Sequence, residues 1–417
     1  MAHTQHTMDK KIKFANIVKA DSERVNILEE KTNHYVKFGV YNDFPNSLIE
    51  LYNNSSIHNT CVNAIVDGIV GEGLVTDPAY ILDVANSDGE SWNDIFKKVA
   101  QDFKLFGGFA LEVIWNKART KVAEVYHIDF SWLRAKEKDY RGKVPGYFIS
   151  DEWAEQYRYG ARPATDLPYL PVYNPKKAID EAKQIYVYNP YRPGQKYYPL
   201  PDYVGALRVI DLDCEVDNFH VNNLKNGLAP SLAITTFTNA DEDEREAIER
   251  MLRLQYQGTN NAGSMMYMDV ADPSVAPQIT LIPQNGADGY YTTLNDTVVQ
   301  KILTAHRITS PMILGIKTEG QLGGRAEVID AYLLLINTVI RPFQQDILTV
   351  FETLLEAKYP ELEITLGVQQ LKLFNDGEEE VDVVTSIDAE IGEDSELEAD
   401  IEKADREEDI QNDIYPI

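Results

Sequence analysis

The feature that most constrains the fold is a pair of helical patterns separated by a small, compact insert. The first pattern covers about 202–225, with Asp202 as a plausible N-cap and Asn226-Gly227 as its end. The insert at about 228–284 reads as strand, helix, strand, strand (βαββ). The second helical pattern covers about 291–307. This order of helix, insert and helix is more informative than any single motif in the chain.

A glycine-rich stretch, GIKTEGQLGGRAE (315–327), follows the second helical pattern. Glycine-rich loops that lead into a helix often cradle phosphate, but a Walker loop needs Lys-Ser or Lys-Thr after its last glycine and a strand before its first. This stretch lacks both features, and GIVGEG (68–73) lies at a helix end, where backbone amides do not face an anion. Neither stretch is therefore predicted to bind a nucleotide.

A long helical pattern at 326–358 comes after the glycine-rich stretch. Its apolar residues recur in steps of three and four: Ile329, Leu333, Ile336, Ile340, Phe343, Ile347 and Phe351. Pro342 lies inside this pattern and has no backbone N–H, so we expect it to kink the helix.

The first 200 residues predict an α+β unit. Helical patterns cover SLIELYNN after Pro45, then IHNTCVNAIVDGIV, then SWNDIFKKVAQDFKLF. The third pattern has an apolar stripe of Trp92, Ile95, Val99, Phe103 and Phe106. FALEVIWN and VAEVYHID read as paired strands, and the Tyr- and Pro-rich residues 150–202 read as short strands and irregular loops. One further strand is expected at LEITLG (362–367).

Charge is unevenly distributed along the chain. The net charge is −28 at pH 7, and residues 376–417 hold 18 Asp and Glu against Lys403 and Arg406, so this acidic tail predicts little ordered structure. The first helix of the pair is also acidic, with a surface expected to include Asp211, Asp213, Glu215 and Asp217. Its expected apolar stripe consists of Leu207, Ile210, Cys214 and Val221.

This charge pattern bears on nucleic-acid binding. A protein that grips duplex DNA presents clustered Lys and Arg, and this chain does not. A protein that lets DNA slide past without holding it would also avoid a basic surface.

Motifs for catalysis or metal binding are absent from the sequence. The seven histidines form no HxH or HExxH pattern, and no GxSxG or DxDxDG run occurs. His127, next to an acidic residue, is expected to be a structural histidine on a strand. Cys61 and Cys214 are far apart, so we expect no disulfide or zinc framework and a reducing compartment, and Cys214, which lies between acids, is expected to be an unreactive core thiol. We therefore expect no enzyme, no cofactor and no metal. The alternative is an α+β hydrolase with a lid and a carboxylate-bound metal.

Several stretches spread over about 40–365 together resemble the portal proteins of tailed bacteriophages, in the broad HK97-like group and a branch associated with Bacteroidetes phages and proviruses. The stretches are CVNAIVDGIVGEGL, FKLFGGFALEVIWN with KVAEVYHIDFSWLRA, YYPLPDYVGALRVIDLDCEVDNFHVNNLKNGLAPS, YQGTNNAGSMMYM, ILTAHRITSPMILGI and GGRAEVIDAYLLLINTVIRPFQQDI. Two local departures are Ser310-Pro311, where many members have Pro-Pro, and Arg325-Ala326-Glu327, where many have Asn-Ala-Glu.

The resemblance implies an α+β portal fold that forms a ring, dodecameric in a capsid. It divides the chain into a wing (1–202), a first stem helix (203–227), a βαββ clip (228–284), a second stem helix (285–308), a tunnel loop (309–325), a long kinked helix with the C-terminal part of the wing (326–375), and an acidic tail or crown (376–417). Candidate tunnel-loop residues toward DNA are Lys317, Thr318, Glu319, Gln321 and Arg325. The acidic face of the first stem helix is assigned to Asp211, Glu215 and Asp217.

The resemblance also implies a function without catalysis. Such a ring lies at the capsid vertex of the virion, is assembled in the host cytoplasm, and conducts double-stranded DNA during packaging and ejection. Its expected partners are the large terminase, the head–tail adaptor and the major capsid protein, and no membrane. A portal-like subunit of a defective prophage or a gene-transfer particle is an open alternative.

Overall fold

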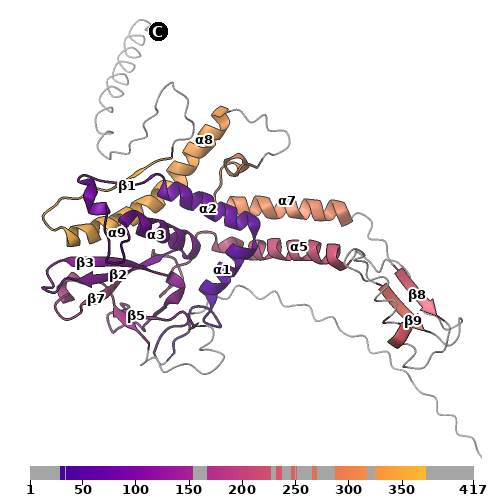
Figure 1. The fold of residues 1–417 in the computed structure, drawn as a ribbon, viewed down its shortest axis with the longest axis horizontal. Helices are drawn as coiled ribbons and strands as arrows, with labels where there is room; N and C mark the ends of the chain where they lie inside the picture. The colour runs from indigo at the N-terminus through magenta and orange to yellow at the C-terminus, as the bar shows by residue number, and fades with distance from the viewer. Residues whose placement is uncertain are drawn as a thin grey trace, which may run out of the picture.

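The computed structural model describes residues 29–32, 34–153, 167–226, 232–236, 246–248, 250, 265–269, 287–316 and 325–371. Most of these residues form an α+β body, and a pair of helices projects from it (Figure 1). The acidic tail at 376–417 lies outside the described residues.

Three helices in the first part of the chain form one side of the body: α1 (Phe44–Asn54), α2 (Ser56–Val70) and α3 (Trp92–Phe106). Proline in the first turn starts α1, Ser55 caps α2, and a capping box between Ser91 and Asp94 starts α3. All five residues of the predicted apolar stripe of α3 are buried, so this prediction is confirmed.

Gly107 ends α3 in the left-handed region, at φ 82°. A Cβ at this position would lie 2.3 Å from the carbonyl of Leu200. Only glycine therefore satisfies both the turn and the close approach of the two backbones.

The main sheet has the strand order β3-β2-β7 and is antiparallel, with β2 (Phe109–Trp115) between β3 (Val122–Ile128) and β7 (Lys183–Tyr188). The predicted pairing of the first two strands is confirmed. A second antiparallel sheet contains β4 (Leu133–Ala135), β5 (Gly146–Ile149) and β6 (Tyr169–Pro171). Residues 167–202 thus contain short strands and loops, as predicted.

The strand predicted at LEITLG is wrong in position. The observed strand β10 is Gly367–Gln369, which pairs with β1 (Gly73–Val75). Ile364 and Leu366 are buried, so their apolar alternation reflects packing against the core. A hydrogen-bonding partner strand is available only from Gly367 onward.

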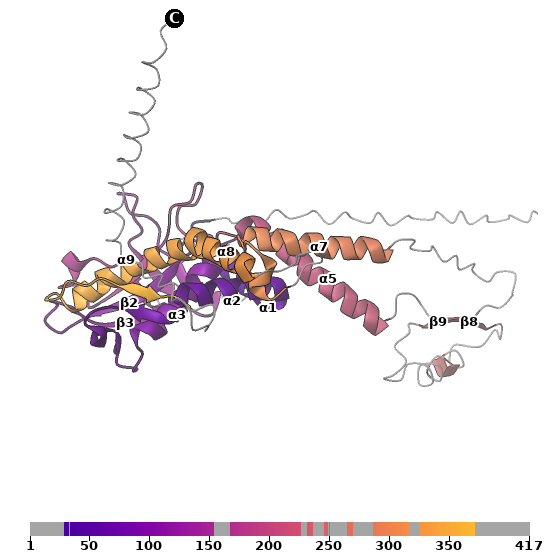
Figure 2. The same cartoon turned by 90° about the horizontal axis from the view of Figure 1, so that it is seen from above.

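The projecting helices are α5 (Leu207–Asn226) and α7 (Ala287–Ala305), which we call the helix pair. They pack against each other, and both views place their outer ends away from the body (Figures 1 and 2). The insert between them contains β8 (Leu232–Thr236) and β9 (Met265–Asp269), which are parallel and lie beyond those ends. The strand predicted at 279–283 and most of the helix predicted from Asp241 lie outside the described residues.

After α7 the chain forms a 3₁₀ turn, η7 (Pro311–Leu314), and then α8 (Arg325–Leu335) and α9 (Arg341–Lys358), which are joined by a π-helical segment, η8 (Ile336–Ile340). The kink at Pro342 stays a prediction, and the helix changes to a π-helical hydrogen-bond pattern that ends two residues before this proline. Pro342 cannot donate to the carbonyl four residues earlier, and the wider π turn accommodates that loss.

The π segment lies where the long helix crosses α2. A Cβ at Gly68 would lie 2.3 Å from Cδ1 of Ile340, so the glycine allows the two helices to approach closely. Ile336, Val339 and Ile340 are buried in this crossing.

Candidate functional site

The acidic side chains predicted on the first helix of the pair are only partly where the sequence suggested. Asp211, Glu215 and Asp217 are exposed on α5. At about 3.6 residues per turn, Asp211 and Glu215 share one side of the helix, while Asp217 lies farther round it. The expectation for Asp213 is wrong: this residue is 5% exposed, and its carboxylate accepts a hydrogen bond of 2.7 Å from Ser55 Oγ.

The predicted apolar stripe of α5 also needs correction at its outer end. Leu207 and Ile210 are buried and Cys214 is half-buried, but Val221 is 45% exposed, and Val216 is buried instead. The apolar stripe of α5 is therefore buried only in the part of the helix from Leu207 to Val216.

The candidate tunnel-loop residues Lys317, Thr318, Glu319 and Gln321 lie outside the described residues. Arg325 is the first residue of α8. The chain before the loop is described: Ser310 Oγ accepts a hydrogen bond from the backbone N–H of Met312, and Gly315 has a φ of 76°. The structure therefore places both ends of the predicted loop without testing the roles of its side chains.

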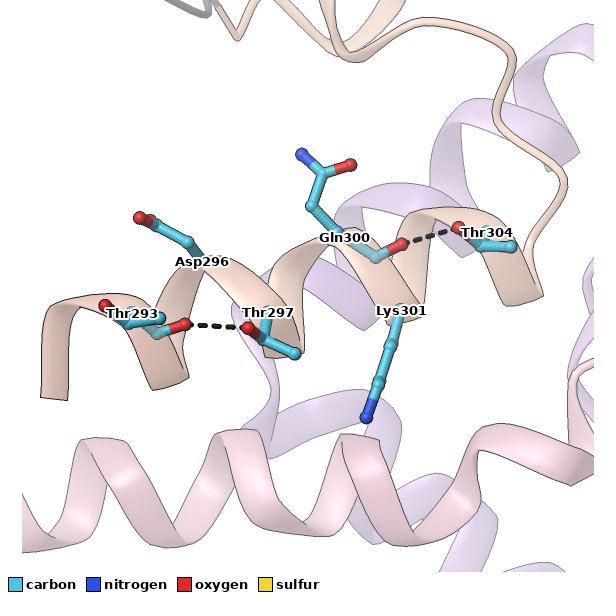
Figure 3. Close-up of a pocket in the computed structure, with 6 residues that line it drawn as sticks. All are labelled: Thr293, Asp296, Thr297, Gln300, Lys301 and Thr304. Carbon is cyan, nitrogen blue, oxygen red and sulfur yellow. Dashed lines mark hydrogen bonds between the residues drawn. The ribbon is translucent and has the colours of Figure 1, made fainter. Parts of the chain in front are cut away.

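The outward side of α7 carries a shallow groove of about 430 Å³ (Figure 3). Two of its hydroxyls bond back to their own helix, from Thr297 to the carbonyl of Thr293 (2.8 Å) and from Thr304 to that of Gln300 (2.7 Å). In Figure 3 Lys301 points toward α5. The hydroxyls of Thr297 and Thr304 are therefore satisfied within α7, and the groove is also lined by the polar side chains of Asp296, Gln300 and Lys301.

A buried cation lies where the helix pair joins the body. Lys104 of α3 is fully buried, and its Nζ donates to both carboxylate oxygens of Asp202, at 2.8 and 2.9 Å. Arg307 Nη2 lies 3.4 Å from the same carboxylate. Burial lowers the pKa of Lys104, and the adjacent Asp202 carboxylate opposes that shift.

The prediction that Asp202 caps the first helix is therefore wrong. A 3₁₀ turn, η5 (Val204–Ala206), precedes α5, and no side chain caps it. The Asp202 carboxylate accepts hydrogen bonds from Lys104, which is 98 residues away in the sequence. An unpaired buried ammonium group costs more free energy than an uncapped helix end, so the carboxylate pairs with Lys104.

Two buried histidines lie in the same region. His58 of α2 and His306 at the end of α7 are both fully buried, with Nδ1 of the first 2.9 Å from Nε2 of the second. The ring of Tyr203 lies 4.7 Å and 4.9 Å from the two imidazoles, and its hydroxyl donates to the carbonyl of Leu105. Sequence motifs could not reveal this pair, because its members are 248 residues apart.

Both histidines are neutral. Burial lowers the pKa of His58 to about 4, and the positive charge of Lys104 adds to this effect. Burial also lowers the pKa of His306, with further contributions from Lys104 and His58. His58 Nε2 and His306 Nδ1 have no hydrogen-bond partner among the described residues.

A third link connects α2 with α5. Ser55 Oγ accepts from the backbone N–H of His58 at 3.2 Å, and it donates to Asp213. We call the whole set the root cluster, and it consists of Ser55, His58, Lys104, Asp202, Tyr203, Asp213, His306 and Arg307.

Other titratable residues have structural partners. His127 Nε2 lies 2.8 Å from Asp102 Oδ2, which also accepts from the backbone N–H of Phe130, so His127 is held in a structural contact as expected. Burial raises the pKa of the Cys61 thiol to about 12, and burial with Asp213 and Asp211 raises that of Cys214 to about 11. Both thiols are therefore poorly reactive at neutral pH.

The described part of the chain contains no group of three or more His, Cys, Asp or Glu side chains arranged to hold a metal ion. None of its helices combines the length and the apolar character needed to cross a bilayer.

Acid is expected to destabilise the fold through His58. The pKa of His58 is about 4 in the folded chain and about 6.5 when unfolded, so between these values the unfolded chain binds more protons. This contribution to stability is complete above about pH 6.5 and is lost as the pH falls toward 4.

Urea unfolding at pH 7 and pH 4.5 measures this effect, and the free energy of unfolding should fall by about 2–3 kcal/mol from this residue. Because carboxylates also titrate in this range, the measure is the difference in pH dependence between the wild type and His58→Gln. Equal dependence in both would contradict the assignment.

No protein-family model matches the chain, and no curated protein sequence matches it. Among solved structures, it is similar to a chain in the virion of a native gene transfer agent (GTA) particle, with 15% identity, 78% of this chain and 83% of that chain covered, and a TM-score of 0.52. A chain in the neck of a native GTA particle, computed with C12 symmetry, gives 15% identity, coverages of 80% and 85%, and a TM-score of 0.50.

An HK97 family phage portal protein from Corynebacterium diphtheriae aligns with 11% identity, coverages of 76% and 93%, and a TM-score of 0.40. The fold assignment rests on the two GTA structures. The chain shares its fold with them, which confirms the predicted mixed helix-and-sheet architecture.

Proposed function

We propose that this chain is the subunit of a portal ring, which lies at the capsid vertex of a phage or phage-like particle and conducts double-stranded DNA. The observation that carries this proposal is the helix pair: two packed helices project from an α+β body and hold a small insert at their outer ends. The same fold occurs in a particle neck computed with C12 symmetry, and the sequence resembles HK97-like portals.

In this proposal each part of the chain has a place in the ring. Residues 1–202 form the wing, and 203–227 and 285–308 form the stem helices. Residues 228–284 form the clip, 309–325 the tunnel loop, 326–375 the long helix with the rest of the wing, and 376–417 the tail or crown. The clip docks the large terminase during packaging and then the head–tail adaptor. The wing contacts the major capsid protein, and the ring is assembled in the host cytoplasm.

The groove on α7 suits contact with a neighbouring subunit in the ring. Thr297 and Thr304 bond to their own helix, so their hydroxyls need no partner from another helix, and Asp296, Gln300 and Lys301 supply polar groups with which a neighbouring subunit can pair. A protein–protein contact of this kind needs neither a catalytic residue nor a cofactor, and we propose that the chain has neither.

The acidic side of α5 suits the wall of a DNA channel. Duplex DNA carries a phosphate about every 1.7 Å along its axis, so a basic wall would hold the DNA at every step. Asp211 and Glu215 instead repel phosphates, and screening limits this effect to about 8 Å from the wall at physiological salt. The DNA is then kept away from the channel wall, and the screened repulsion does not oppose its movement along the channel axis.

Charge reversal on α5 tests the channel. Replacing Asp211, Glu215 and Asp217 with Lys should slow or stall DNA passage, because the new cations would bind phosphates. The measurement is the rate and extent of packaging into particles that carry the variant ring. A matched control is the same change at Glu356, Glu361 and Glu363, which are exposed on the body. Unchanged packaging in the α5 variant would mean that this helix does not line the channel.

A second setting for the same ring is a gene-transfer particle or a defective prophage. The two GTA structures described above come from such particles, which supports this alternative. Sequencing of the packaged DNA distinguishes the two, since a functional phage packages its own genome and a gene-transfer particle packages fragments of the host chromosome.

A further inference from the structure

Three polar links hold the helix pair to the body, and each involves a different body residue. Lys104 of α3 binds Asp202, just before α5. Ser55, at the start of α2, binds Asp213 within α5. His58 of α2 binds His306, at the end of α7. Both helices of the pair are therefore fixed at the root, one by two links and the other by one.

These links depend on orientation more than apolar packing does. Hydrogen bonds weaken steeply with distance and angle, and the body residues of the three links, Ser55, His58 and Lys104, are fully buried, so a lost partner is not readily replaced by water. A small tilt of the helix pair would break all three hydrogen-bonded links. Apolar side chains would remain in contact after the same displacement, because apolar packing is not directional. The root cluster is thus suited to two discrete arrangements, intact or open, with little between them.

The cluster also contains features that an ordinary core lacks. His58 Nε2 and His306 Nδ1 are buried without a hydrogen-bond partner among the described residues, which offsets part of what their mutual bond contributes. Arg307, directly after α7, has a φ of 57°, a left-handed conformation unfavourable for a residue other than glycine. Opening the cluster would expose the two ring nitrogens to water, so the two arrangements lie closer in free energy than in a fully satisfied core.

We infer that the root cluster is a latch: it fixes the tilt of the helix pair against the body and couples that tilt to residues 308–316, which lead into the predicted tunnel loop. The coupling passes through His306 and Arg307, since these two members of the cluster lie between the end of α7 and residue 308. The biological meaning of the latch rests on the proposed function: as DNA pushes on the helix pair, residues 308–316 would respond.

Hydrogen–deuterium exchange of the full-length chain, read by mass spectrometry, tests the latch. Lys104→Met removes one link and Ser55→Ala removes another. If the links open together, each variant should raise exchange roughly tenfold or more at the start of α5, at the end of α7 and in residues 308–316. Exchange in β2 and β3 should stay unchanged.

Gln184→Met is the matched control. Gln184 is fully buried and bonds to Trp115 Nε1 (3.1 Å) and to the backbone N–H of Asn174 (2.9 Å), within the body. This variant should raise exchange around β2 and β7 and leave the root unchanged.

Two outcomes would overturn the latch. In one, each variant raises exchange only next to its own substitution. In the other, exchange rises uniformly over the chain. If Lys104→Met does not fold, Ser55→Ala alone decides between these results. The exchange measurement needs neither a ring nor DNA. If the exchange result contradicts the latch, the proposed portal function still stands, and if the protein forms no ring, the coupling measured by exchange is unaffected.

Discussion

Replacing Asp202 with Ala is expected to lower the free energy of unfolding by about 3–5 kcal/mol, the largest effect on stability that we predict for a single substitution. The substitution leaves the ammonium group of Lys104 fully buried, with its two hydrogen bonds to Asp202 lost. Arg307 cannot compensate, because it is also a cation. Urea unfolding at pH 7, followed by tryptophan fluorescence, measures the loss.

Two controls separate the buried pair from charge effects in general. The double variant Lys104→Met with Asp202→Ala should regain most of the lost stability, since no unpaired charge is then buried. Lys183→Ala breaks an ion pair with Glu112 in which Lys183 is 57% exposed, and it should cost less than about 1 kcal/mol. If Asp202→Ala costs no more than Lys183→Ala, the buried pair does not stabilise the root as described.

Deleting residues 317–323 is expected to abolish packaging or retention of DNA while ring assembly stays intact. The prediction follows from the sequence resemblance, which assigns these residues to a loop in the channel. The described residues on both sides have contacts of their own, since η7 contacts α2 and α8, and α8 continues into η8. Imaging of the ring and the DNA content of particles measure the two effects separately.

A same-length Gly–Ser replacement of 317–323 distinguishes loop length from side-chain contacts. If Lys317 and Glu319 touch passing DNA or the neighbouring loop, the replacement should impair packaging as the deletion does. If length alone matters, the replacement should package normally. Loss of the ring itself in either variant would contradict the tunnel-loop assignment.

Elements with a long, one-sided apolar pattern could be predicted from the sequence. The stripe of α3 was predicted correctly because its residues recur every three or four positions and all face one core. LEITLG was misplaced because alternating burial and strand pairing produce the same pattern, and only the position of β1 decides where the pairing begins.

The root cluster could not be predicted, because its contacts join residues far apart in the sequence. An acidic residue directly before a helix is usually interpreted as its N-cap. Nothing near Asp202 in the sequence indicates that its carboxylate pairs with Lys104 instead. Asp213 looked like part of an acidic surface because its neighbours Asp211 and Glu215 are exposed. Its burial follows from Ser55, 158 residues earlier. The histidine pair gave no sequence signal at all.

The central claim is that this chain forms a ring, and electron-microscopic imaging of the purified full-length protein tests it most directly. We predict closed rings with a central hole, in which the helix pairs of successive subunits lie side by side around the channel. Compact monomers or dimers at every salt and protein concentration would contradict the claim. Metal-dependent hydrolytic activity in such a monomer would favour the lidded hydrolase instead.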